Sequence, residues 1–189
     1  MENALIVCSS EKGIEFYSQL LRSTGIPELF GVKNGAEARR LFIDNDFDVV
    51  LVHAPLMDEY GSEVAAAAAE RTSAGVLLVV KNEVADEVAA RVEDYGVIVV
   101  GWPILKPLFH QALKIAAASR RRMLGLKSKN VQLQRQIEDM RLIDRAKCAL
   151  IQCLHMTEPQ AHRYIEKQAM DKRVTKRQVA ESILETYGG

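Results

Sequence analysis

Five short apolar runs, separated by amphipathic stretches, constrain the fold more than any other feature of this sequence. The runs are residues 4–8, 29–32, 49–53, 76–80 and 97–101. Each is continuously apolar and rich in β-branched residues, which indicates strands buried on both faces of a parallel sheet. Between the runs apolar residues recur at helical spacing, as at Ile14, Tyr17 and Leu21. Residues 1–118 are therefore predicted to form an α/β domain around a five-stranded sheet.

The net charge of zero conceals two oppositely charged parts. Residues 1–118 hold 10 Lys and Arg against 17 Asp and Glu, whereas residues 119–189 hold 15 against 8. The net charges are therefore −7 and +7, which suggests two modules with different partners. A basic module is a candidate nucleic-acid binder, because its cations displace counterions from phosphates. Attraction between the two parts, or simple solvation of the charges, would explain the same split.

Several classes of protein are excluded or disfavoured by composition. No apolar run approaches the ~18 residues needed to span a bilayer, and the first residues lack the basic leader of a secretory signal. Cys8, Cys148 and Cys153 are odd in number and have no metal-ligand spacing. We therefore expect a reduced, cytoplasmic protein with no cofactor, no metal and no membrane association. An enzyme is not expected either, since the sequence has no nucleophile–base pair and no glycine-rich phosphate loop.

A long helical connector is predicted after the α/β domain, at residues 119–141. Gly125 is the only glycine between residues 108 and 157, and this stretch holds no proline. A heptad frame covers about three repeats, near the lower limit for a coiled coil. Its a positions are Met123, Asn130 and Ile137, and its d positions are Leu126, Leu133 and Met140. A single Asn at an a position fixes the register of two-stranded coils, so we expect a parallel homodimer. The stripe could instead pack on the protein's own domains.

Residues 142–189 are predicted to form a small all-α bundle of three helices. The second helix begins with a capping box of Thr157 and Gln160, and the third with Thr175 and Gln178. Each helix carries one apolar stripe, and the three stripes can be buried together. Two tyrosines lie on these stripes, Tyr164 and Tyr187. They are expected in the core, although stacking on nucleic-acid bases is an alternative.

The first domain resembles the receiver domain of bacterial response regulators. The segment DVVLVHAPLMDEYG is similar to that family's third strand and following loop, and GVIVVGWPILKPLF to its fifth strand. The resemblance implies a flavodoxin-like fold with strand order 2-1-3-4-5 and a cis peptide bond before Pro103.

Every position that performs phosphoryl transfer in receivers is altered here. The acidic pair aligns with Cys8 and Ser9, and the phosphoryl acceptor with His53. The family's Ser or Thr aligns with Val80, or with Lys81 after a shift of one residue, and its lysine with Trp102. Without carboxylates there is no Mg²⁺ cage, so we expect no phosphorylation.

Other groups near this altered site do not restore its chemistry. Glu11 or Asp58 could offer one carboxylate, which is a poor Mg²⁺ site, and both are as readily explained as plain surface. His53 is expected to be hydrogen-bonded at the edge of the sheet rather than phosphorylated. The remaining roles for this domain are a dimerisation surface, a docking site for a regulatory protein, or a pocket for a small ligand.

The carboxyl-terminal segment resembles an ANTAR domain, the module named after the AmiR and NasR transcription antitermination regulators. The matching pieces, in order, are Arg145-Ala146-Lys147, Met156-Thr157-Glu158 with Ala161, Ala169-Met170-Asp171 with Arg173, and Val179-Ala180. The resemblance implies binding to stem-loops of nascent leader transcripts, which prevents a terminator hairpin from forming.

Seven cations on the polar faces are the candidate RNA contacts. They are Lys147, Arg163, Lys167, Lys172, Arg173, Lys176 and Arg177. The last four cluster before the third helix, near its N-terminal amides, and predict a phosphate-binding corner. Two other functions stay open: a signalling adaptor that docks to proteins without binding RNA, and a protein that binds duplex DNA.

Overall fold

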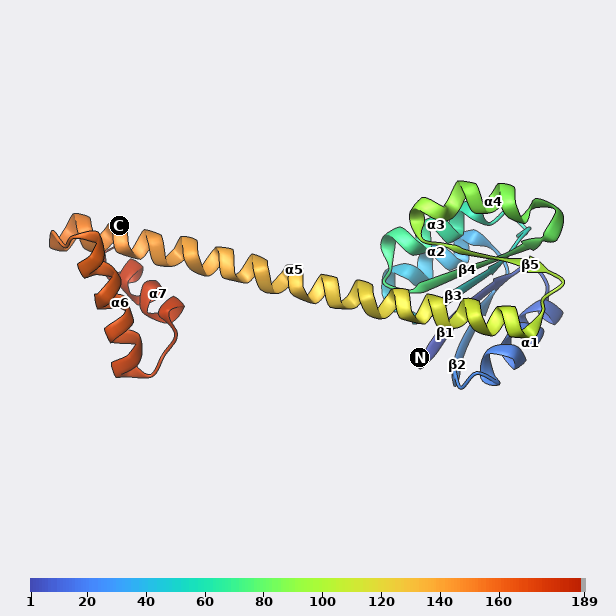
Figure 1. Ribbon diagram of the computed structural model, residues 1–189, viewed down its shortest axis with the longest axis horizontal. Helices are drawn as coiled ribbons and strands as arrows, with labels where there is room; N and C mark the ends of the chain where they lie inside the picture. The colour runs from blue at the N-terminus through green and yellow to red at the C-terminus, as the bar shows by residue number, and fades with distance from the viewer. Residues whose placement is uncertain (188–189) are drawn as a thin grey trace. The chain divides into compact units, whose positions relative to one another are not determined.

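The computed structural model describes residues 1–187, which divide into two compact units on either side of the Gly125–Leu126 bond. The first unit contains a five-stranded parallel sheet of order β2-β1-β3-β4-β5 (Figure 1). Its strands are β1 (Asn3–Cys8), β2 (Glu28–Val32), β3 (Val49–His53), β4 (Gly75–Lys81) and β5 (Ile98–Trp102). This architecture confirms the predicted fold, its strand positions and its strand order.

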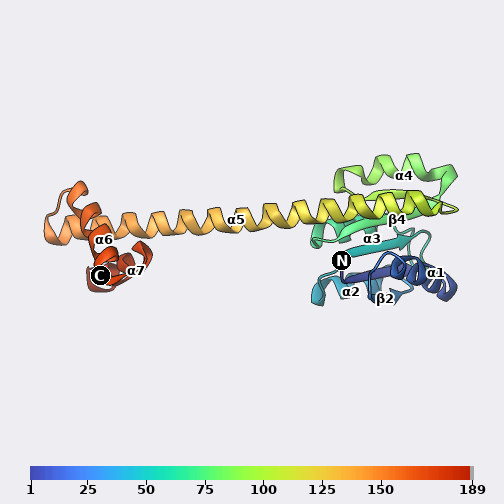
Figure 2. The same ribbon diagram turned by 60° about the horizontal axis from the view of Figure 1, so that its bottom comes forward.

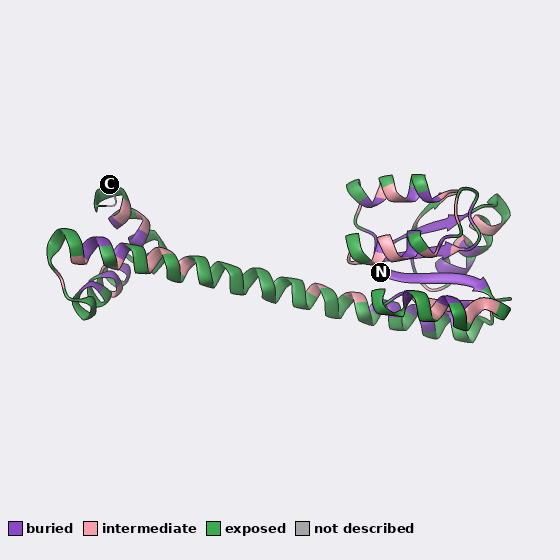
Figure 3. Ribbon diagram, turned by 90° about the horizontal axis from the view of Figure 1, so that it is seen from above, coloured by how far each residue is buried: buried purple, intermediate pink, exposed green. Residues whose placement is uncertain are grey.

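Helices cover both faces of the sheet and bury the two apolar cores that the continuous strand pattern requires. One core lies between the sheet and α2, α3 and α4, and the other between the sheet, α1 and the beginning of α5. These helices are α1 (Glu11–Arg22), α2 (Gly35–Asp44), α3 (Ser62–Arg71), α4 (Ala85–Val92) and α5 (Lys106–Leu154). Two 3₁₀ turns, η1 (Asn82–Val84) and η2 (Glu93–Tyr95), flank α4. Figure 3 shows the buried strands between partly exposed helices.

Local sequence signals explain where the elements of this unit begin and how closely they approach. Ser10 and Asn34 cap α1 and α2, since each side-chain oxygen accepts a backbone N–H three residues later. Gly75 begins β4 directly beneath α5, where an added Cβ would lie 2.6 Å from the carbonyl oxygen of Ala116. The peptide before Pro103 is cis, as predicted, and the peptide before Pro55 is also cis, which the sequence did not indicate.

Helix α5 is the longest element and runs without interruption through both predicted domain boundaries, at 118 and 141 (Figures 1 and 2). Gly125 lies inside it with open space around its Cα, which fits the small cost of an isolated helical glycine, about 1 kcal/mol. Within residues 1–187 no helix has the length and apolarity needed to cross a bilayer.

The second unit packs the end of α5 against α6 (Glu158–Lys172) and α7 (Lys176–Tyr187). Its core consists of small and medium apolar side chains from all three helices. Both predicted capping residues are in place: Gln160 accepts the Thr157 N–H at 2.8 Å, and Gln178 accepts the Thr175 N–H at 3.0 Å. The expectation that Tyr164 and Tyr187 belong to this core is wrong, because both side chains are exposed.

Candidate nucleic-acid interface

The carboxyl end of the sheet, where receivers transfer phosphate, is filled here by an aromatic cluster. The Oη of Tyr17 lies 2.6 Å from Nδ1 of His53, and the rings of His53 and Trp102 lie 5.4 Å apart between centroids. Phe16 contacts both Tyr17 and Trp102 edge to face. Cys8 ends β1 in the register opposite His53 and is buried. Three of the five aligned positions, Cys8, His53 and Trp102, therefore come together at this end.

The other two aligned positions do not join this cluster. Val80 is fully buried in the core that faces α2, α3 and α4, whereas Cys8 belongs to the opposite core. Ser9 is exposed beyond the end of β1. Lys81, the alternative to Val80, is exposed as well.

The cluster favours neutral groups. Burial lowers the pKa of His53 and raises the pKa of Tyr17. An uncharged imidazole and an intact phenol can share the short hydrogen bond between them, whichever of the two donates. This environment differs from the charged, cation-binding site that phosphoryl transfer requires.

The nearby carboxylates are engaged in protein contacts. Asp58 accepts the N–H groups of Gly35 and Ala36 at 2.9 and 3.1 Å and so caps the beginning of α2, and the hydrogen bond from Gly35 lowers the pKa of Asp58. Glu11 pairs with Lys33 at 2.9 Å, and that hydrogen bond lowers the pKa of Glu11. Among residues 1–187 no group of three His, Cys, Asp or Glu side chains is arranged to hold a metal ion.

Three of the seven candidate RNA-binding cations are engaged in ion pairs. Lys147 lies 2.8 Å from Asp144 and 3.0 Å from Glu158, and its hydrogen bond to Asp144 raises its pKa. Lys176 lies 2.6 Å from Glu166. Arg177 lies 2.7 Å from Asp139 and 2.9 Å from Glu181. These three candidates are therefore engaged by acidic side chains on α5, α6 and α7.

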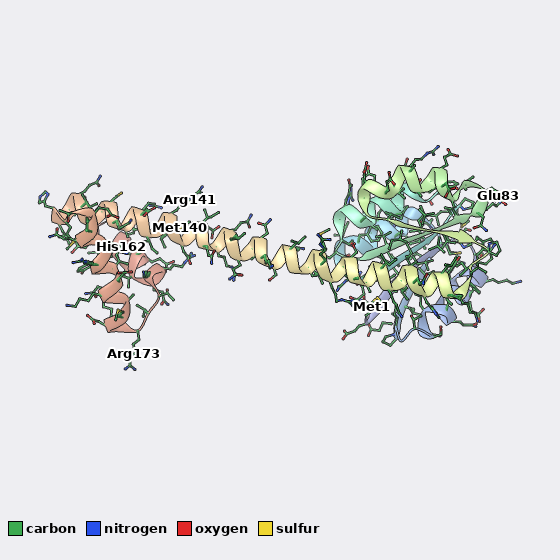
Figure 4. The ribbon with its side chains drawn as sticks, viewed as in Figure 1. Met1, Glu83, Met140, Arg141, His162 and Arg173 are labelled. Atoms are coloured by element: carbon green, nitrogen blue, oxygen red, sulfur yellow. The ribbon has the colours of Figure 1, made fainter. Side chains whose placement is uncertain are left out.

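The other four cations make no ion pair within residues 1–187. Arg163 and Lys167 are one helical turn apart on α6 and share its exposed face with Met170, which is 78% exposed. Lys172 and Arg173 end the same helix and are exposed. In Figure 4 the Arg173 side chain points away from the turn between α6 and α7. The four candidate contacts that make no ion pair here thus lie on α6 and at its C-cap.

The backbone at Arg173 is left-handed, with φ 55° and ψ 42°. Its N–H bonds to the carbonyl of Met170, and the N–H of Val174 bonds to the carbonyl of Ala169 at 3.0 Å. These two bonds form a Schellman motif, whose left-handed position is usually glycine. An arginine there is strained by roughly 1 kcal/mol or more, which nothing in the sequence pattern revealed.

The predicted heptad positions form an uncovered apolar stripe along α5. Met123, Leu126, Leu133, Ile137 and Met140 are between 45% and 58% exposed. Asn130 is exposed in the same row, and much of the middle of α5 is coloured green, for exposed residues, in Figure 3. Within residues 1–187 these apolar side chains therefore stay at least 45% exposed.

Comparisons with known proteins agree with both halves of this description. Residues 131–184 match the ANTAR domain family. The chain is 29% identical over 176 residues to the transcriptional regulatory protein PdtaR of Mycobacterium tuberculosis, covering 90% of this chain and 83% of that protein.

Solved structures support the fold of the first unit. A receiver domain from an HD domain-containing protein of Pseudomonas fluorescens superimposes with a TM-score of 0.56 at 20% identity, covering 64% of this chain and 89% of that one. A response regulator receiver domain protein from Clostridium thermocellum gives 0.57 at 18% identity, covering 66% and 99%. The chain thus carries a match to the ANTAR domain family in its second unit and a receiver-like fold in its first, and it is similar over most of its length to a transcriptional regulatory protein.

Proposed function

We propose that this regulator binds RNA stem-loops through α6 of its ANTAR domain, as a dimer, and acts in transcription antitermination without phosphorylation of its receiver-like domain. The observation that carries the proposal is a group of cations on α6 and at its C-cap that make no ion pair in the described part of the chain, namely Arg163, Lys167, Lys172 and Arg173. They occupy the domain that matches the ANTAR family. Phosphate contacts from such side chains supply affinity that does not depend on sequence.

The ion-paired cations are a second source of phosphate contacts. Lys176 and Arg177 are about half exposed, as are their carboxylate partners, and exposed pairs stabilise a protein by only about 0–1 kcal/mol. RNA phosphates can therefore compete with Glu166 and Asp139 for them. Lys147 is more buried and bridges two carboxylates, so we rank it last among the candidate contacts.

Dimerisation is supported by the open stripe on α5. Isolated exposed apolar residues are ordinary, but a row at heptad spacing is the surface that a second helix covers in a coiled coil. A dimer carries two ANTAR domains, so two stem-loops of one transcript would be bound with an increased effective concentration.

The absence of phosphorylation is supported by the aromatic cluster at the altered site. A phosphoryl group needs nearby cations. In receivers an acidic pair binds Mg²⁺ and a lysine adds a second positive charge, but the aligned positions here hold Cys8, Ser9 and Trp102. Asp58 caps α2, so it is held away from a metal-binding role.

Binding of a stem-loop RNA, compared with a duplex DNA of the stem sequence, tests the function directly. Fluorescence anisotropy at several salt concentrations should show binding to the RNA that weakens steeply with salt. Arg173→Glu should abolish this binding, and the matched Arg40→Glu, an exposed arginine on α2, should not. Equal affinity for duplex DNA, or no binding to either, would contradict the proposal and favour a DNA-binding or protein-docking role respectively.

A further inference from the structure

A hollow of about 390 Å³ lies between α6 and α7, beside the free cations of α6. Tyr164, Gln168 and Lys172 line it at successive turns of α6, and Gln178, Ser182 and Tyr187 line it from α7. Its size falls within the range of pockets that hold small ligands, roughly 300–1,000 Å³. Lys172 and Gln178 lie close to the connection between the helices, while Tyr187 ends α7.

The two tyrosines of the hollow are more exposed than their apolar positions predict. Tyr164 is 37% exposed and Tyr187 38%, although each continues a helical stripe whose other apolar members are buried or partly buried. Neither phenol hydroxyl forms a hydrogen bond within residues 1–187. The aromatic rings of Tyr164 and Tyr187 therefore present surface that the fold does not use.

The polar groups of the hollow have free hydrogen-bonding capacity. The carboxamide of Gln168 makes no hydrogen bond within residues 1–187, and the Gln178 side chain uses only its oxygen, which accepts from Thr175. A carboxamide donates and accepts side by side, as the edge of a nucleobase does. Lys172 completes the lining with a positive charge.

We propose that this hollow receives one unstacked base of the RNA loop, which deepens the function proposed above and rests on it. The base stacks on Tyr164, with Tyr187 closing the far side. Its edge forms hydrogen bonds with Gln168, and its phosphate lies against Lys172. Single-stranded RNA is recognised in this way, by aromatic stacking together with contacts to base edges. The hollow thus selects among loop sequences, while the cations of α6 hold any stem-loop.

The test uses the full chain and a library of RNA hairpins with a fixed stem and a randomised loop. Tyr164→Leu, which keeps apolar bulk but removes the aromatic face, should weaken binding of the selected hairpin by roughly 5- to 150-fold. Tyr164→Phe should bind as the unmodified chain does. Tyr60→Leu provides the matched control, because Tyr60 is 45% exposed but lies in the receiver-like unit.

An abasic nucleotide at the contacted loop position identifies the base. It should weaken binding of the unmodified chain and leave binding of Tyr164→Leu unchanged, since both changes remove the same contact. Photocrosslinking of the unmodified chain, which does not depend on how a variant folds, should join a loop base to Tyr164 or Tyr187. Crosslinks confined to other residues, or full affinity of Tyr164→Leu, would overturn the base pocket while leaving RNA binding intact. Failure of the unmodified chain to bind any hairpin would instead refute the proposed function.

Discussion

The left-handed arginine at the end of α6 offers a test that separates folding from function at one residue. Replacing Arg173 by glycine should stabilise the protein. A non-glycine residue at positive φ is disfavoured by about 1–2 kcal/mol. Glycine removes this cost but lowers the free energy of unfolding by roughly 0.5–1 kcal/mol, because it has greater conformational freedom in the unfolded chain. The expected net gain is therefore about 0.5–1 kcal/mol.

The same substitution should weaken RNA binding, because it removes one of the four free cations of α6. Arg173→Ala is the matched variant: it also removes the charge but keeps the strained backbone, so its stability should stay near that of the unmodified chain. Thermal unfolding followed by circular dichroism measures the first effect, with an expected rise of a few degrees for a small unit. RNA titration at several salt concentrations measures the second, and the slope of log affinity against log salt should fall by about one in both variants.

Two results would refute this reasoning. A lower melting temperature for Arg173→Gly than for Arg173→Ala would mean that the backbone at Arg173 is not strained. Unchanged RNA affinity in both variants would mean that this side chain does not contact the RNA.

Four further outcomes follow from the structure. Asn130→Leu should change the oligomeric state measured by light scattering, because it places an apolar side chain at the register-setting position; equal, monomeric masses for both proteins would contradict the coiled coil. Burial lowers the pKa of His53 in the folded protein, so the stability that neutral His53 contributes is complete above about pH 6.5, the pKa of an unfolded histidine. This stability declines as the pH falls from there toward the lowered pKa of the folded state, with a slope of at most about 1.4 kcal/mol per pH unit. His53→Gln should remove that part of the stability profile, and an unaltered profile would show that His53 is not responsible. Gly75→Ala should destabilise the first unit by roughly 1–3 kcal/mol in chemical denaturation, because the new methyl group meets the backbone of α5; a neutral result would show that α5 can shift. Acetyl phosphate should leave the mass of the chain unchanged, whereas a phosphoryl adduct on His53 would contradict an unphosphorylated receiver.

The fold was predictable because its signals are local and repeat. Each buried strand is a continuous apolar run, and Thr175 and Gln178 mark the start of α7 by residue type and spacing alone. The altered receiver positions were also predictable in part. Cys8, His53 and Trp102 each end a strand, and the ends of parallel strands meet at one edge of a sheet.

The details of the candidate RNA-binding surface were not predictable, because they depend on contacts between distant residues. Arg177 reaches Asp139, which lies 38 positions earlier in the chain, and no periodicity indicates such a pair. Tyr164 satisfies the helical pattern of a core residue but lies where α7 leaves part of it uncovered. The left-handed backbone at Arg173 was not predictable either, because arginine is not a residue type that favours positive φ.

The aromatic packing at the altered site has a consequence for any attempt to introduce an acceptor aspartate there. An aspartate introduced at position 53 would enter a site where the Cys8 thiol is enclosed and the Trp102 ring occupies the place of a cation. It would also lose the hydrogen bond that Tyr17 shares with His53. An aspartate at position 53 alone would therefore place an uncompensated charge among aromatic rings. Under the proposed function, a signal reaches this domain by binding rather than by phosphotransfer.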